Sequence, residues 1–172
     1  DLHSFPTRRS SDLEISVHKN LEIVHLSRKG MFREMQNIKA MMNLKKGLRD
    51  KLTAVTPELM AFLQIKDLYY VEADGRMKSV MESSFDGDAS DISDLMKEDI
   101  FTDRTLDRVE KDSPVFYRTL KEKGLESALI MRFGSSASAP CYLVCAVERA
   151  FRIWQDNECA ILYYLTGLLE QE

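Results

Sequence analysis

The chain has 172 residues, of which 44% are hydrophobic and 30% are charged. This composition supports one folded domain with an attached helix and excludes wholesale disorder. The sequence contains no run of about 18 apolar residues, so no membrane-spanning helix is predicted within it. The net charge of −4 argues against general nucleic-acid binding.

The first thirteen residues differ from the rest of the chain. Residues 1–13 combine Pro6 with a Ser- and Arg-rich middle and show neither helical nor strand periodicity. The string resembles translated sequencing-adapter sequence, which occurs at the ends of gene predictions from metagenome assemblies. We therefore treat residues 1–13 as a non-native leader and expect the natural protein to begin further upstream.

A long amphipathic helix follows this leader. Apolar residues recur at heptad spacing at Val17, Leu21, Val24, Met31, Met35, Ile38 and Met42. We assign residues 14–47 to a linker or signalling helix that ends or bends near Gly47. The stripe favours two alternatives equally: packing against the sheet of its own chain, or a parallel coiled-coil dimer.

Residues 48–172 are predicted to form the domain itself. A second helix runs through about Leu63, with Thr56 as the N-cap of a turn renewed at Pro57. A β-hairpin spans residues 67–82 and turns at Asp74-Gly75. Residues 83–112 are acidic and irregular, which predicts a loop with one or two short helices.

Two nearly continuous apolar runs follow, at residues 127–133 and 141–148. Such runs are typical of adjacent central strands that are buried on both faces. Residues 115–117 fit either a short strand or the start of a helix, and the helical turn after them closes at Gly124. With a terminal helix at 156–172, the sequence predicts an α+β fold: an antiparallel sheet of about five or six strands flanked by helices, with a long N-terminal helix.

Three stretches of the C-terminal half carry a family resemblance: Lys123–Met131 (KGLESALIM), Cys141–Val147 (CYLVCAV) and Arg152–Glu158 (RIWQDNE). Together with the hairpin, they resemble a GAF domain over residues 48–172. The last stretch is most similar to sensor domains attached to bacterial GGDEF diguanylate cyclases. One departure is that Val144-Cys145 stand where the second strand of the family usually carries a glycine.

The resemblance implies a regulatory sensor and dimerisation domain of a cytoplasmic bacterial signalling protein. The output domain, such as a diguanylate cyclase that makes cyclic di-GMP, would lie outside this chain, which has no GGDEF sequence and is not expected to be an enzyme itself. The expected partners are a second copy, through helices 14–47 and 156–172, and a small-molecule ligand, with no nucleic acid and no membrane. The alternative is a stand-alone GAF-type enzyme similar to free methionine sulfoxide reductase, which uses cysteine.

No cofactor is expected. The three histidines, His3, His18 and His25, lie outside the predicted core, which argues against a His-ligated haem or metal. No histidine adjoins a cysteine, as the covalent bilin sites of the family require, and the Asn-Lys-Phe-Asp-Glu signature of cyclic-nucleotide GAF domains is absent. The acidic residues 85–91 fail the EF-hand pattern and indicate a solvated loop.

Two residues are weak candidates for ligand binding, Arg132 and Cys145. Arg132 is the one charged residue of its apolar strand and could meet an anion, although we favour a salt bridge to Glu148 on the neighbouring strand. Cys141, Cys145 and Cys159 are interpreted as reduced, buried thiols. Cys141 and Cys145 would lie about 13 Å apart along one strand, too far for a disulfide.

Overall fold

The structure is a computed structural model that describes residues 30–134 and 139–170. The predicted leader 1–13 and residues 14–29 of the predicted helix lie outside the described residues. Residues 30–42 are helical, and the later elements are α2 (Leu48–Leu63), β1 (Tyr69–Val71), β2 (Arg76–Ser79), β3 (Asp86–Asp88), the short 3₁₀ helix η1 (Ile92–Leu95), β4 (Ile100–Asp103), α3 (Asp107–Asp112), α4 (Pro114–Glu122), β5 (Ser127–Phe133), β6 (Cys141–Val147) and α5 (Asp156–Leu169).

The described strands form an open six-stranded sheet in the order β3-β2-β1-β6-β5-β4, and each neighbouring pair is antiparallel. The predicted pairing of the two apolar strands is confirmed. β6 lies in the middle of the sheet and β5 lies between it and the edge strand β4, and the pair is in register from Ser127 opposite Val147 to Phe133 opposite Cys141. The predicted α+β class and the number of strands are confirmed as well.

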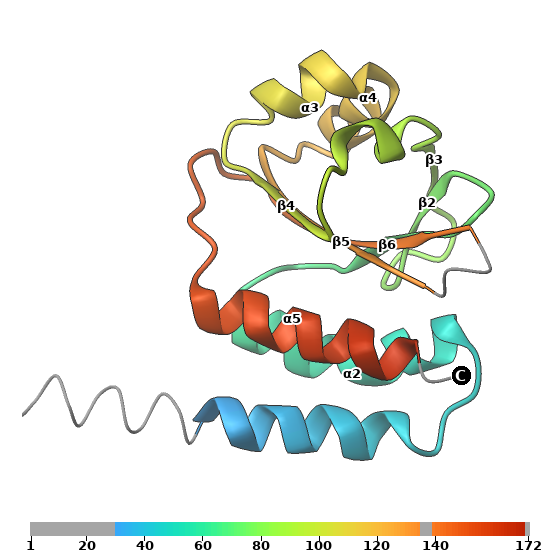
Figure 1. Cartoon of the computed structure of the whole chain (residues 1–172), viewed down its shortest axis with the longest axis vertical. Coiled ribbons are helices and arrows are strands. Elements are labelled where there is room, and N and C mark those ends of the chain that lie inside the picture. Colours follow the sequence, from blue (N-terminus) through green and yellow to red (C-terminus); the bar gives the residue numbers. More distant parts are fainter. Residues whose placement is uncertain (1–29, 135–138, 171–172) are drawn as a thin grey trace, which may run out of the picture.

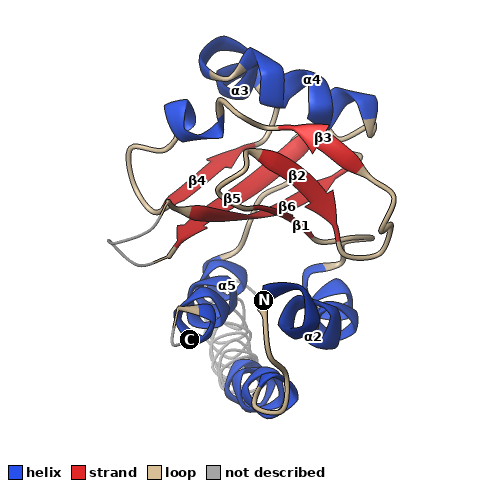
Figure 2. Ribbon diagram, turned by 90° about the vertical axis from the view of Figure 1, so that its right-hand side faces the viewer, coloured by secondary structure: helices blue, strands red, loops and turns tan. Residues whose placement is uncertain are grey.

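Helices cover both faces of the sheet (Figures 1 and 2). α2 and α5 lie on one face, with helix 30–42 packed on their outer side, and η1, α3 and α4 lie on the other face. Because side chains alternate along β6, Leu143 and Cys145 join the core beneath α2 and α5, whereas Tyr142, Val144 and Ala146 join the core beneath α3 and α4. One sheet therefore separates two apolar cores.

Helix 30–42 belongs to the first of these cores. Ile38 and Met42 are buried in the cluster that α2 and α5 form, and Met31 and Met35 pack against it while partly exposed. These four residues of the predicted stripe pack within the chain, but helix 30–42 lies on the outer side of α2 and α5 and not against the sheet as predicted (Figures 1 and 2). Ile38 is thus a core residue, and a polar replacement there would disturb the fold itself. The coiled-coil dimer stays a prediction.

Helix α2 runs without a break, so the predicted N-cap at Thr56 is wrong. Thr56 is helical and buried, and its hydroxyl donates to the Leu52 carbonyl at 2.6 Å. Pro57 removes one backbone donor inside the helix, but it lies on the exposed face, where water can bind the freed carbonyl. Burial of the opposite face keeps the helix continuous through the proline.

The acidic stretch 83–112 contains two strands that the sequence did not predict. β3 has the sequence Asp-Gly-Asp, which disfavours strands, and it forms because it pairs with β2 at one edge of the sheet. β4 pairs with β5 at the opposite edge. Tertiary pairing thus overrides local preference in this stretch, while η1 and α3 are the short helices that were expected there.

The remaining predicted elements agree closely with the structure. The hairpin at 67–82 is β1 and β2, with Gly75 at a φ of +72° in the turn. Residues 115–117, which fitted a strand or a helix, belong to α4, and Gly124 follows that helix with a φ of +73°. No described helix is both long and apolar enough to span a membrane.

Candidate functional site

The space between the sheet and α4 is filled by apolar side chains. Val71, Ile130 and Val144 from the sheet share a cluster with Phe116 and Leu120 from α4, and all five side chains are fully buried. The region is therefore packed as a core, and the remaining candidates for a site are the polar residues and the outer surfaces.

Arg132, the first candidate, lies on β5 and forms an ion pair with a carboxylate of its own chain. Its Nη2 lies 2.9 Å from Oδ1 of Asp99, and its backbone N–H donates to the Asp99 carbonyl at 2.7 Å. The predicted partner Glu148 is wrong, because Glu148 binds Lys66 at 3.2 Å. The register explains the difference: Arg132 lies opposite Tyr142, at the other end of β6 from Glu148. Whether Arg132 meets a ligand stays a prediction.

Cys145, the second candidate, is fully buried beneath α2 and α5. Burial raises the pKa of its thiol to about 12, and burial also raises the pKa of the Cys141 and Cys159 thiols. All three cysteines are free, although Cys141 and Cys159 are only half-buried. Because the thiolate is the nucleophile of thiol chemistry, Cys145 is suited to packing rather than to reaction at neutral pH.

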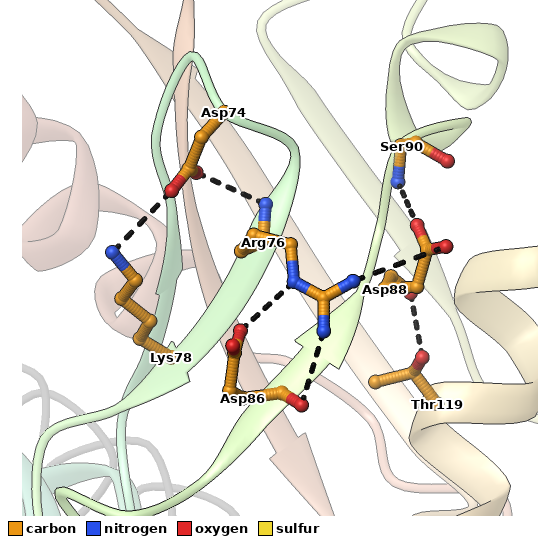
Figure 3. Close-up of polar contacts among 7 residues, drawn as sticks. All are labelled: Asp74, Arg76, Lys78, Asp86, Asp88, Ser90 and Thr119. Atoms are coloured by element: carbon orange, nitrogen blue, oxygen red, sulfur yellow. Dashed lines mark hydrogen bonds and ion pairs between the residues drawn. The ribbon is translucent and has the colours of Figure 1, made fainter.

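The acidic residues near the hairpin form ion pairs at the sheet edge. Figure 3 shows Arg76 between two aspartates of β3: its Nε lies 2.9 Å from Asp86 and its Nη1 lies 4.0 Å from Asp88. The Asp88 carbonyl accepts a hydrogen bond from the Thr119 hydroxyl of α4 at 2.5 Å. These contacts fasten the edge strand β3 to β2 and to α4.

Two further aspartates hold the helices of the second face. The Asp91 carboxylate accepts hydrogen bonds from the backbone N–H groups of Val115 and Phe116, both at 2.9 Å. The Asp103 carboxylate accepts from the N–H of Arg108 at 2.8 Å. Both satisfy orphan donors at a helix start. Within the described residues, no group of three or more His, Cys, Asp or Glu side chains is placed to hold a metal ion.

The outer surface of α5 is apolar, as its buried face is. From residue 159 to residue 169 the helix carries no charged side chain. Its outer residues line a groove of about 680 Å³ together with Met35, Ile100 of β4 and Met131 of β5, and Tyr163 in this groove is 67% exposed. We call it the α5 groove. The α5 residues of the lining are Asp156, Cys159, Ala160, Tyr163, Tyr164, Gly167 and Leu168. A helix that is apolar all round is typical of one that is covered on every side.

The sequence predicted dimer contacts on helices 14–47 and 156–172, but not the groove that the outer face of α5 forms with Met35. The charge-free run from residue 159 to residue 169 was the signal that could have identified it, since the buried face alone needs fewer apolar residues. The structure brings Met35 of the predicted stripe to the rim of this groove, whereas Arg132 and Cys145 are not among its lining residues.

No family model and no curated protein matches this chain. Solved structures do match it. A phycocyanobilin-bound GAF domain from a cyanobacterial phytochrome is 19% identical with a TM-score of 0.58, and the match covers 82% of this chain and 94% of that one. The chromophore-binding domain of Stigmatella aurantiaca phytochrome P1 is 11% identical with a TM-score of 0.60, covering 81% and 58%.

A GAF domain of a different kind of protein matches equally well. The GAF domain of an Acinetobacter phosphoenolpyruvate-protein phosphotransferase is 12% identical with a TM-score of 0.56, covering 81% of this chain and 89% of that one. At such low identities the likeness concerns the fold alone. The chain has the GAF fold.

Proposed function

We propose that this chain is a regulatory sensor and dimerisation domain of a bacterial signalling protein. In this proposal it acts in the cytoplasm and controls an output domain outside the chain, such as a diguanylate cyclase. The GAF fold supports the sensor role, since solved structures with this fold include chromophore-binding domains of phytochromes. The observation that carries the proposal is the apolar α5 groove beside helix 30–42.

The helix layer suits the transmission of a signal. Helix 30–42 packs on the outer side of α2 and α5, on the same side of the sheet, and it and α5 are the first and the last described elements of the chain (Figures 1 and 2). A second copy that covers the α5 groove would place two such helix layers against each other. A shift of the sheet beneath α5, on binding a small molecule, would then change the spacing of whatever follows residue 172.

The enzyme alternative receives no support from the thiols. Cys145 is buried with a pKa raised to about 12, and it lies on the face of the sheet that packs against α2 and α5. A reductase of the methionine sulfoxide type needs an accessible thiolate. We therefore propose the sensor function alone.

The first experiment measures the mass of the full chain by light scattering at micromolar concentrations. We expect a dimer, and Tyr163→Glu should give a monomer with an unchanged circular dichroism spectrum. Met81→Glu is the matched control, because Met81 is also exposed, at 59%, but lies after β2 away from α5. A monomeric unmutated chain would contradict dimerisation through α5.

The second experiment tests control of an output domain. The chain is fused in frame, after residue 172, to the catalytic domain of a diguanylate cyclase, and synthesis of cyclic di-GMP is measured. We expect Tyr163→Glu to change the rate and Met81→Glu to leave it unchanged. Equal rates for both variants and the unmutated fusion would contradict a regulatory role for the helix layer.

A further inference from the structure

A second groove, of about 400 Å³, lies where the loop after β4 meets the loop between β6 and α5. Two arginines, Arg104 and Arg108, line it together with Phe151, Ile153 and Trp154. We call it the arginine–aromatic groove. It lies apart from the α5 groove, and the two share no lining residue.

The apolar side of this groove is exposed although it is held rigidly. Phe151 is 69% exposed and Ile153 is 59% exposed. The alternate residues of this loop, Arg152 and Trp154, are buried. Phe151 has a φ of +64°, a left-handed conformation that costs a non-glycine residue about 1 kcal/mol or more. The loop thus keeps a large aromatic side chain in water at the expense of backbone strain, as is typical of contact surfaces.

Hydrogen bonds from one buried serine fix the two loops to each other. The Ser127 hydroxyl lies 2.7 Å from the Arg104 carbonyl and 2.8 Å from the Arg149 carbonyl, and it accepts from the Arg152 N–H at 3.3 Å. The Phe151 N–H donates to the Arg104 carbonyl at 2.7 Å. A groove that is fixed before binding loses little conformational entropy when it is occupied.

The arginines of the groove carry uncompensated charge. In the part of the chain that the structure describes, neither Arg104 nor Arg108 forms an ion pair, and the Arg108 guanidinium stacks over the Phe101 ring at 4.5 Å. Asp103 also lines the groove, but its carboxylate accepts hydrogen bonds from backbone N–H groups at the start of α3, and the two arginines leave the groove with a net positive charge. Guanidinium groups in such a setting match carboxylates in geometry and charge.

We propose that the arginine–aromatic groove binds an acidic segment of a partner protein, in which carboxylates stand close to one aromatic or large aliphatic anchor. The carboxylates would meet Arg104 and Arg108, and the anchor would pack on Phe151 and Ile153. The residues before helix 30–42 do not offer such a segment: residues 1–13 carry two arginines against two aspartates, and residues 14–29 carry three basic against two acidic residues.

A peptide fits the charge distribution better than an anionic membrane does. Residues 53–172 carry 13 Lys or Arg against 22 Asp or Glu, so an extended anionic surface would repel the domain as a whole. A single peptide meets only the local charge of the groove. The occupant is therefore distinct from the second copy that the α5 groove is proposed to bind.

The test begins with a phage-displayed library of random peptides selected on the full chain. We expect enriched peptides that combine Asp or Glu with Phe, Trp or Leu within a few positions. A fluorescein-labelled peptide of the enriched sequence is then titrated with the chain by fluorescence polarisation, and its affinity should fall as salt is added. Failure to enrich any sequence, or enrichment without acidic residues, would overturn the proposal.

Two variants locate the binding. Phe151→Gly suits the left-handed backbone, so the melting temperature should stay equal or rise, while affinity for the peptide falls at least about tenfold. Arg108→Glu should weaken binding to a similar extent, and Arg33→Glu is the matched charge reversal on the opposite helix layer, which should leave binding unchanged. Full affinity of Phe151→Gly, or binding to phosphatidylglycerol vesicles in place of peptides, would refute the peptide site.

Discussion

The side chain of Glu34 on helix 30–42 meets the side chain of Glu58 on α2, so two carboxyl groups lie together where these helices pack. Burial, together with the hydrogen bond and the charge of Glu58, raises the pKa of Glu34 to about 7. Oε1 of Glu34 is buried without a hydrogen-bond partner in the described part of the chain. Such a pair is stable when one of its members holds a proton.

The stability of the domain should therefore fall as the pH rises toward neutrality. The folded chain holds a proton on Glu34 up to about pH 7, whereas the unfolded chain releases it near the ordinary value of 4.5. The contribution is fully present below pH 4.5 and is lost as the pH rises through about 7. The measurement is the melting temperature from pH 5 to pH 8.

Glu34→Gln is the matched variant for this dependence. The amide keeps a donor for Glu58 and cannot ionise, so the variant should melt higher than the unmutated chain at pH 8 and lose the decline between pH 5 and pH 8. Arg33→Gln, at the exposed neighbouring position, should retain the decline. The same decline in the chain with Glu34→Gln would show that another group causes it.

Replacing either Leu129 or Leu143 by Asp should unfold the domain. Both side chains are fully buried between the sheet and the helices α2 and α5, on the paired interior strands β5 and β6. Each replacement would bury an unpaired carboxylate, which costs several kcal/mol, on the order of the whole stability of a small domain. Loss of the cooperative thermal transition checks this outcome, and Met81→Asp, at an exposed position, should preserve the transition. Two variants of native stability would refute the placement of β5 and β6.

The sequence predicted those parts of the fold in which local pattern and tertiary contacts agree. The apolar runs of β5 and β6 must be buried on both faces of any sheet that they join. Gly75 and Gly124 predict turns because glycine readily adopts a positive φ. β3 could not be predicted in this way, because its Asp-Gly-Asp sequence is a strand only beside Arg76 and β2. Residues 86–88 are therefore extended because of their pairing at the sheet edge and not because of their own sequence.

The candidate sites were predicted less well than the fold. Arg132 was expected to pair on a neighbouring strand, and the sequence contains no information on the register that places Asp99 beside it instead. The arginine–aromatic groove joins residues that are about fifty positions apart, such as Arg104 and Phe151, through a loop contact that no local pattern shows.

Gly87→Ala should destabilise the domain by about 1–3 kcal/mol. A Cβ at this position would overlap the Thr119 methyl group and lie 3.1 Å from the Phe85 ring. Thr119 cannot turn away freely, because its hydroxyl donates to the Asp88 carbonyl at 2.5 Å. Chemical denaturation measures the loss. Gly30→Ala is the matched control: a Cβ there meets nothing within 4 Å and should leave the helix equal or more stable.

The buried ion pair between Arg152 and Glu158 provides the last prediction. Arg152 is 6% exposed and Glu158 is 8% exposed, and Nη2 lies 2.5 Å from Oε2. The same guanidinium stacks on the Trp154 ring at 4.2 Å, and Glu158 also accepts the Gln155 N–H as part of the capping box of α5. The pair thus joins the loop before α5 to the start of that helix.

Removing one partner of the ion pair should lower the free energy of unfolding far more than neutralising both partners. Arg152→Met leaves the Glu158 carboxylate buried without its cation and should lower the free energy of unfolding by about 3–5 kcal/mol. Adding Glu158→Gln removes the stranded charge while keeping an oxygen for the Gln155 N–H, so the double variant should regain most of the loss. Urea unfolding of the two single variants and the double variant gives the coupling free energy directly. If the losses of the single variants simply add in the double variant, the two charges do not depend on each other, and α5 is held in place by its apolar contacts alone.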